Sequence, residues 1–132
     1  MPEKNKNTMQ LTKAEEQVMQ ILWNLKEGTV KDILDMFPEN KPARTTVATI
    51  LSILENKNFV EHYTYGRINI YKPLVSKEKY SNKQLFGLVN DYFGGSFQSM
   101  VSFFAKENNL DIEEMDKILK EAREELLKQK KL

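Results

Sequence analysis

The first half of the chain carries hydrophobic residues at spacings of three and four, a pattern that predicts three helices. The first begins at Thr12, which with Glu15 forms the S/T-x-x-E capping box, and ends near Gly28. The second occupies residues 29–37, with Thr29 as its cap and Pro38 as its stop, and the third occupies residues 42–57. The predicted buried positions are Ala14, Val18, Ile21, Leu22 and Leu25, then Val30, Ile33, Leu34 and Phe37, then Val47, Ile50, Leu51 and Leu54.

Two β-rich runs, residues 59–65 and 68–72, follow the third helix and surround Gly66-Arg67. Glycine supplies the positive φ that a tight turn requires, so these runs predict an antiparallel hairpin. Helix, helix, turn, helix and hairpin within about 75 residues is the arrangement of a winged helix-turn-helix. We therefore expect a winged-helix domain over residues 11–75, after a flexible amino-terminal arm of residues 1–10.

Residues 76–132 lack a strand signal and predict three more helices, at 76–92, at 96–106 and after Asp111, with Gly94-Gly95 as the first break. Short helices this apolar cannot bury their faces on each other alone, so we expect a helical dimerisation domain; packing back on the winged helix as a monomer is the alternative. The fold class is then mostly α with a small β-wing. The predicted dimerisation residues are Leu85, Leu88, Phe97, Met100, Val101, Phe104, Met115, Leu119 and Leu126.

The composition narrows the class of protein. With 132 residues and 40% hydrophobic content, the chain suits one domain or a small domain with an appended helical module. Absence of cysteine excludes disulfides and thiolate metal sites, and no apolar run approaches the roughly 20 residues that span a bilayer. Residues 1–10 are polar and lack the apolar core of a secretory signal, so we expect a cytoplasmic protein.

The net charge of +1 conceals an uneven distribution. Residues 41–75 carry five basic and two acidic groups, a net +3, whereas residues 1–40 carry five basic and seven acidic groups, a net −2. Positive charge on the third helix and hairpin is what a phosphate-facing surface requires, although chance sampling of a charge-rich surface is the plain alternative. The distribution favours a nucleic-acid partner.

The face of the third helix opposite its buried stripe offers one basic group and several hydroxyls. In a winged helix the amino-terminal end of this helix meets base edges in the major groove, where arginine pairs with guanine and threonine contacts thymine. The hairpin tip adds a basic group that can reach a phosphate or a narrow minor groove. Cross-strand packing is the alternative role for Tyr63, Tyr65 and Tyr71. The predicted DNA-binding residues are Arg44, Thr45, Thr46, Thr49, Ser52, Tyr65 and Arg67.

No pattern of catalytic or metal-ligating residues stands out. His62 is the only histidine, and it has no cysteine or paired carboxylate beside it in the sequence that would make it a base or a zinc ligand. The carboxylates of Glu113-Glu114 and Glu124-Glu125 point apart on a helix and have lysine neighbours. We expect no enzyme, cofactor or metal site.

Several motifs together resemble the penicillinase repressor family of winged-helix regulators, the BlaI, MecI and CopY type. They are Leu11-Thr12-Lys13-Ala14-Glu15-Glu16-Gln17-Val18-Met19 and Ile21-Leu22-Trp23, Thr45-Thr46-Val47 with Thr49, Lys57-Asn58-Phe59-Val60, and Tyr92-Phe93-Gly94-Gly95. The resemblance covers nearly the whole chain from Leu11 and implies that Trp23 is a core residue. This chain departs from the family's pattern in two respects. The family often has basic residues where this chain has Thr45 and Ala48, and the copper-responsive members have a cysteine-rich tail, whereas this chain has no cysteine.

The resemblance implies a homodimeric repressor that occupies a palindromic operator, typically of β-lactam-resistance genes. It further implies relief by proteolysis in the carboxy-terminal domain, after a membrane sensor metalloprotease detects the antibiotic. The family's cut between asparagine and phenylalanine would match Phe103 and Phe104, whose first residue departs from that pattern; a core role for both phenylalanines is the alternative. Two other functions remain open, a ligand-sensing winged-helix regulator and a winged-helix protein-interaction module.

Overall fold

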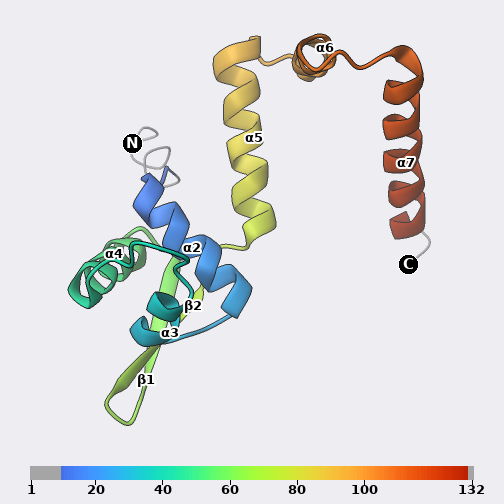
Figure 1. The fold of residues 1–132 in the computed structure, drawn as a ribbon. Coiled ribbons are helices and arrows are strands. Elements are labelled where there is room, and N and C mark those ends of the chain that lie inside the picture. Colours follow the sequence, from blue (N-terminus) through green and yellow to red (C-terminus); the bar gives the residue numbers. More distant parts are fainter. Residues whose placement is uncertain (1–9, 131–132) are drawn as a thin grey trace. The chain divides into compact units, whose positions relative to one another are not determined.

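A computed structural model describes residues 10–130 and confirms a mostly helical fold with one two-stranded antiparallel sheet (Figure 1). Apart from Gln10, the predicted flexible arm lies outside the described residues. The chain divides into two compact units, Met1–Gln84 and Leu85–Leu132. The elements are α2 (Lys13–Leu25), α3 (Val30–Asp35), α4 (Arg44–Asn56), β1 (Val60–Tyr65), β2 (Ile68–Pro73), α5 (Lys77–Phe93), α6 (Phe97–Glu107) and α7 (Ile112–Lys130).

Side chains cap the first two helices as the sequence predicts. In α2 the Thr12 Oγ1 accepts from the Glu15 backbone N–H at 3.2 Å, and the Glu15 carboxylate accepts from the Thr12 N–H at 3.0 Å. Thr29 caps α3 in the same reciprocal manner with Asp32. These bonds satisfy backbone donors that have no partner within the helix, and they fix where each helix begins.

The first helix ends near Gly28, as predicted, and Gly28 itself pairs with the hairpin. The helix ends at Leu25, and Lys26 leaves it with a φ of 75°. Gly28 then exchanges two backbone hydrogen bonds with Tyr71 of β2, at 2.9 and 2.8 Å. This short bridge ties the segment between α2 and α3 to the hairpin, a long-range pairing that the local sequence does not indicate.

The core of the first unit lies among α2, α3, α4 and the base of the hairpin. Most predicted positions are buried or half-buried, but Ala14 is exposed and Met19 takes a buried place in α2. Ala14 stands in the first turn of α2, where the buried position is taken by its neighbour Glu15. The buried apolar residues are Val18, Met19, Ile21, Leu22, Ile33, Phe37, Val47, Leu51, Leu54, Phe59, Val60, Tyr71 and Tyr80.

The hairpin joins β1 and β2 through a two-residue turn at Gly66-Arg67, as predicted. Gly66 has a φ of 65°, and the strands pair in register from Val60 with Pro73 to Tyr65 with Ile68. The pairing alternates faces along each strand. The base of the hairpin is buried, whereas its tip is exposed and projects beyond the helices of its unit (Figure 1).

The start of α5 belongs to the first unit, so the predicted boundary after residue 75 lies too early. The Tyr80 side chain is 3% exposed, its ring packs 5.6 Å from that of Trp23, and its hydroxyl donates to the Glu16 carboxylate at 2.7 Å. Trp23, which is half-buried against the core, donates its indole N–H to the Val75 carbonyl at 2.8 Å. These contacts hold the first turn of α5 on α2, and the contact boundary follows Gln84.

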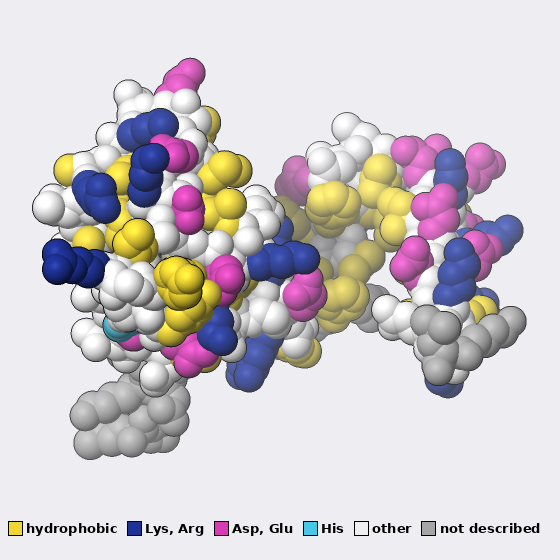
Figure 2. All heavy atoms as spheres, turned by 90° about the horizontal axis from the view of Figure 1, so that it is seen from below, with side chains coloured by type: hydrophobic (Ala, Val, Ile, Leu, Met, Phe, Trp, Pro, Cys, Tyr) yellow, Lys and Arg dark blue, Asp and Glu magenta, His cyan; other side chains and the backbone are white. Residues whose placement is uncertain are grey.

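The second unit contains the rest of α5 together with α6 and α7. Ser96 caps α6, and Asp111 with Glu114 caps α7 reciprocally at 2.8 and 3.2 Å. Val89 is the single apolar residue of this unit that is buried among the described residues. Figure 2 shows hydrophobic side chains gathered on one side of these helices and charged ones on the other. The unit therefore carries a large apolar face that its own helices do not cover.

Candidate nucleic-acid interface

The exposed face of α4 contains all five of the residues that the sequence assigns to it. Arg44, Thr45, Thr46, Thr49 and Ser52 are exposed, while Val47, Leu51 and Leu54 on the other side are fully buried. The buried stripe fixes the rotation of the helix about its axis, because these three side chains fill the core shared with α2 and α3. A rigid helix therefore presents the five side chains to solvent as one surface, which we call the α4 face.

The hydroxyls of the α4 face are not equivalent. Thr49 Oγ1 donates to the Thr45 carbonyl one turn earlier, at 2.9 Å. Its proton is thus engaged within the helix, which leaves its methyl group and an acceptor lone pair for a ligand. Thr45 and Thr46 stand one turn nearer the helix start, where their hydroxyls can donate to a base or a phosphate.

The first turn of α4 also lacks carboxylates, as does that of α6. Its cap residue is Ala43, which offers no side-chain hydrogen bond, and no acidic residue lies in the first turn. By contrast α2, α3 and α7 each begin with acidic side chains. Unpaired backbone N–H groups and the positive end of the helix dipole are compatible with a nearby phosphate.

Basic side chains around the α4 face divide into paired and unpaired groups. Lys57 binds the Glu15 carboxylate at 2.8 Å and Lys72 lies 3.4 Å from Glu61, so both belong to intramolecular ion pairs. Lys41, Arg44 and Arg67 are exposed and make no ion pair with any residue between 10 and 130. Of the five basic groups in residues 41–75, Lys57 and Lys72 are thus paired, and the three that remain unpaired equal the segment's net charge of +3.

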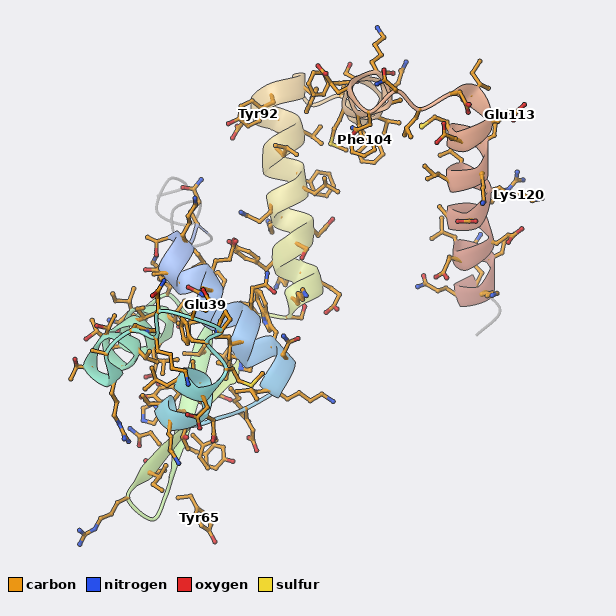
Figure 3. All side chains as sticks on the ribbon, viewed as in Figure 1. Glu39, Tyr65, Tyr92, Phe104, Glu113 and Lys120 are labelled. Carbon is orange, nitrogen blue, oxygen red and sulfur yellow. The ribbon has the colours of Figure 1, made fainter. Side chains whose placement is uncertain are left out.

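The three tyrosines of the hairpin have different surroundings. Tyr71 is 8% exposed and packs 5.2 Å from the His62 ring, which confirms cross-strand packing for one of the three tyrosines. The Tyr63 hydroxyl donates to Glu27 at 3.1 Å; desolvation, with the Glu27 hydrogen bond and charge, raises the pKa of Tyr63. Tyr65 is 76% exposed and extends from the tip (Figure 3).

His62 is a structural residue of the hairpin base. Its Nδ1 lies 2.8 Å from Oε2 of Glu55 at the end of α4. The imidazole therefore faces a carboxylate and Tyr71, and this arrangement provides a polar link between α4 and β1. No cluster of three histidine, cysteine or carboxylate side chains that could hold a metal occurs among residues 10–130.

In the second unit an apolar groove of about 1070 Å³ lies among α5, α6 and α7. Seven of the nine predicted dimerisation residues line it, whereas Leu85 and Leu126 lie outside it. Sequence patterns had not assigned Ile118 or Leu110 to this surface, because neither follows the heptad positions. The lining residues are Leu88, Tyr92, Phe93, Phe97, Met100, Val101, Phe103, Phe104, Leu110, Met115, Ile118, Leu119 and Ala122.

The bond between Phe103 and Phe104 lies inside α6, and both side chains are about half exposed, at 53% and 56%. Phe103 packs against Phe93 with ring centroids 5.4 Å apart. In Figure 3 Phe104 lies on the inner side of α6, while Glu113 and Lys120 point outward from α7. No helix in residues 10–130 is long and apolar enough to cross a lipid bilayer.

Comparison with known proteins identifies the family. A family model described as penicillinase repressor matches residues 11–124. The penicillinase repressor of Bacillus licheniformis is 24% identical over 114 residues, covering 86% of this chain and 89% of the relative. That of Staphylococcus aureus is 28% identical over 115 residues, covering 84% and 91%.

Two further similarities were found. The methicillin resistance regulatory protein MecI of Staphylococcus aureus strain N315 is 26% identical over 112 residues, covering 84% of this chain and 91% of the relative. A solution structure of the DNA-binding domain of the repressor BlaI covers 53% of this chain and 87% of its own, with a TM-score of 0.48 and 22% identity. Since the family model spans most of its length, the chain belongs to the penicillinase repressor family.

Proposed function

We propose that the protein is a DNA-binding transcriptional repressor that acts in the cytoplasm as a homodimer on a palindromic operator. The observation that carries this proposal is the α4 face, a rigid row of hydroxyls with Arg44 at its start and no carboxylate in the first turn. Arginine can pair bidentately with guanine, and the threonine methyls complement thymine, so the α4 face suits the edges of bases in a major groove. Relatives named as penicillinase repressors support a role in β-lactam resistance.

The apolar groove supports the homodimer. Phe97, Phe104 and Leu119 line it and are 56–58% exposed, although burying such a side chain contributes about 1.5 to 3 kcal/mol. A second copy presents the same apolar helices and covers this surface in a symmetric interface. Two linked winged helices then bind two half-sites together, which raises affinity without new contacts in either half.

Proteolytic relief is the regulatory part of the proposal, with a membrane sensor metalloprotease as the partner. The Phe103–Phe104 bond lies within α6, so a protease must unwind this helix before the bond can enter an extended active-site cleft. Cleavage there divides a helix that lines the groove. The dimer would then lose apolar contacts, and the bivalent gain on the operator would be lost with them.

Footprinting on the DNA upstream of the protein's own gene tests the proposed function. Wild type should protect a symmetric site, and Thr46→Ala and Arg44→Ala should each weaken protection about 5- to 150-fold, as expected for a base contact worth 1 to 3 kcal/mol. Lys31→Ala, an exposed basic residue of α3, serves as a matched control. A protein-interaction module that never touches DNA would leave all four proteins without a footprint.

The groove also favours a second candidate, a ligand-sensing regulator in which an apolar molecule occupies the 1070 Å³ space. Titration of aromatic or lipophilic compounds against the protein–DNA complex separates the two candidates. A ligand sensor releases DNA reversibly as the compound is added, whereas a protease-relieved repressor stays bound until the chain is cut. Release at saturating compound with an intact chain would favour the second candidate.

A further inference from the structure

The helix α5 is attached to the first unit at one buried side chain. Between residues 77 and 88 only Tyr80 is buried, and residues 81–86, which follow it, are all exposed. The helix itself continues without a break to Phe93. The contacts that attach α5 to the first unit are therefore concentrated at Tyr80 and at the residues just before it.

Tyr80 is held by its ring and by its hydroxyl. The ring packs against Trp23 and, edge to face at 5.8 Å, against the fully buried Phe59. The hydroxyl donates to Oε2 of Glu16 at 2.7 Å, a length typical of hydrogen bonds that a charged acceptor strengthens. A ring in an apolar contact can turn or slide, whereas the bond at its far end fixes where the ring points.

The residues before Tyr80 fix the start of the helix. The Trp23 indole N–H donates to the Val75 carbonyl, and the Ser76 hydroxyl accepts from the backbone N–H three residues later at 3.0 Å. Glu16 and Trp23 are seven residues apart on α2, so they lie on the same face, separated by about two turns or roughly 10 Å. The chain from Val75 to Tyr80 is thus bonded to α2 at two separate points, and two points determine a direction where one would allow rotation.

The Tyr80 hydroxyl keeps its proton. Burial raises the pKa of Tyr80, and the hydrogen bond to Glu16 and the charges of Glu16 and Glu15 raise it further. The phenol therefore remains a donor throughout the physiological pH range. The bond to Glu16 is a constant feature of the first unit, so the attachment of α5 does not open and close with pH.

We propose that Tyr80, through its bond to Glu16, is a positioning residue that fixes the direction in which α5 leaves the first unit, and that this direction determines which spacing between two half-sites the homodimer prefers. The proposal rests on the proposed function and places a determinant of operator choice outside the α4 face. Each base pair added between half-sites moves one of them by about 3.4 Å and turns it by about 35° around the DNA axis. A dimer with a fixed α5 direction cannot follow this change without losing contacts, whereas a dimer with a loosened α5 can.

The test measures affinity for palindromes whose half-sites, taken from a duplex that the wild-type protein selects from a randomised pool, are separated by different spacers. Wild type should bind the best spacing about tenfold or more tightly than a spacing one base pair longer, because its second contact is then strained. Tyr80→Phe keeps the ring and removes only the hydroxyl, and it should reduce this ratio to about threefold or less, because a hydrogen bond to a charged group is lost. It should bind a single half-site like wild type, whereas a merely destabilised first unit would bind the half-site more weakly and keep its spacing preference.

Variants of the acceptor and a second tyrosine serve as controls. Glu16→Gln keeps a side-chain oxygen that accepts from Tyr80, so it should retain the wild-type spacing preference, whereas Glu16→Ala should lose it. Tyr63→Phe is the matched control, because it removes another tyrosine–glutamate hydrogen bond of the same unit, the one to Glu27, without touching α5. It should retain the wild-type spacing preference. Thermal unfolding shows whether each variant is folded, and Glu16→Ala decides the question if Tyr80→Phe is not.

Distances between the two protomers give an independent measurement. The sequence has no cysteine, so a single Lys31→Cys takes one spin label at an exposed position of α3. Double electron–electron resonance without DNA should give a broader distribution of distances when Tyr80→Phe is added to this labelled protein.

The outcomes separate this proposal from the proposed function. If the variants that remove the bond between Tyr80 and Glu16 keep the wild-type spacing preference, if wild type itself binds all spacings equally, or if the two distance distributions coincide, the positioning role of Tyr80 is overturned. A wild-type protein that binds no palindrome more tightly than a single half-site contradicts the proposed homodimer itself, and the positioning role falls with it.

Discussion

Glu15 has two structural roles, and the sequence indicates only one of them. The capping box with Thr12 follows from their spacing, and the structure confirms it. The ion pair with Lys57 spans 42 residues and has no local signal. Glu15 is buried because α4 ends against the start of α2, so a residue expected on a helix surface became part of the domain interior.

The charge of Glu15 should make stability depend on pH. Burial raises the pKa of its carboxyl group, but hydrogen bonds from Lys57 and Thr12 and the charge of Lys57 outweigh this and hold the pKa below its ordinary 4.5. A lowered folded-state pKa adds stability above the unfolded value, and that stability is lost as pH falls through the folded value. Glu15→Gln keeps the capping geometry, so it should cost about 1 to 2 kcal/mol near pH 7 and progressively less below pH ~4.5.

Urea unfolding of wild type and Glu15→Gln at pH 6.5 and at pH 3.5 measures this difference. Glu39→Gln, an exposed residue of the same unit, serves as the control and should leave both midpoints unchanged. An equal loss at both pH values would mean that the charge of Glu15 does not stabilise the fold.

The exposed face of α4 shows what sequence periodicity determines at the level of an element. Val47, Leu51 and Leu54 recur at helical spacing, and once they are buried the positions of Arg44, Thr46 and Thr49 follow from geometry alone. Periodicity could not indicate that Thr49 donates to Thr45 or that Gly28 pairs with Tyr71. Hydrogen bonds of these kinds depend on the rotamer and on the tertiary fold.

The bounds of helix α5 were predicted to within one residue, but the sequence did not indicate that this continuous helix is divided between two units. Its early residue Tyr80 packs into the first unit and its later residues line the groove of the second. A hydrophobic residue on a helix gives no indication of which unit covers it. The predicted boundary therefore followed the end of the hairpin, whereas the contacts place it after Gln84.

Two glycines of this region should respond oppositely to alanine. A Cβ at Gly87 would meet nothing within 4 Å, so Gly87→Ala should stabilise α5 by about 0.5 to 1 kcal/mol through helix propensity. Gly94 has a φ of 57° after the helix end, so Gly94→Ala should destabilise the protein by about 1 kcal/mol. Thermal unfolding compares the two. A destabilising Gly87→Ala would indicate that a second chain approaches α5 at this position.

The whole molecule has a modest positive charge, and this limits how it binds DNA. Three unpaired basic groups, Lys41, Arg44 and Arg67, lie on α4, the segment before it or the hairpin, and the α4 start adds backbone donors. Three to five phosphate contacts per protomer predict a log–log salt slope of about −5 to −9 for a dimer. Fluorescence anisotropy between 50 and 300 mM salt measures it, and an affinity that barely changes would exclude a phosphate-based interface.

The sequence predicted that the carboxy-terminal helices are apolar, but it could not assign their partner. Their heptad positions Met115, Leu119 and Ala122 line the groove, whereas Leu126 does not. Contacts with a second molecule leave no periodic pattern within one chain, so the sequence does not identify the surface that covers the groove. A symmetric homodimer remains the proposal, because it gives both the apolar helices and the α4 face a role.

Affinity for a full palindrome and for a single half-site of the same selected sequence tests the central claim most directly. The wild-type dimer should bind the full site at least about 100-fold more tightly than the half-site, because the second contact becomes intramolecular. Leu119→Asp, which places a charge in the groove, should abolish this ratio while half-site binding persists. Equal wild-type affinity for the two DNAs would contradict a homodimer that grips two half-sites.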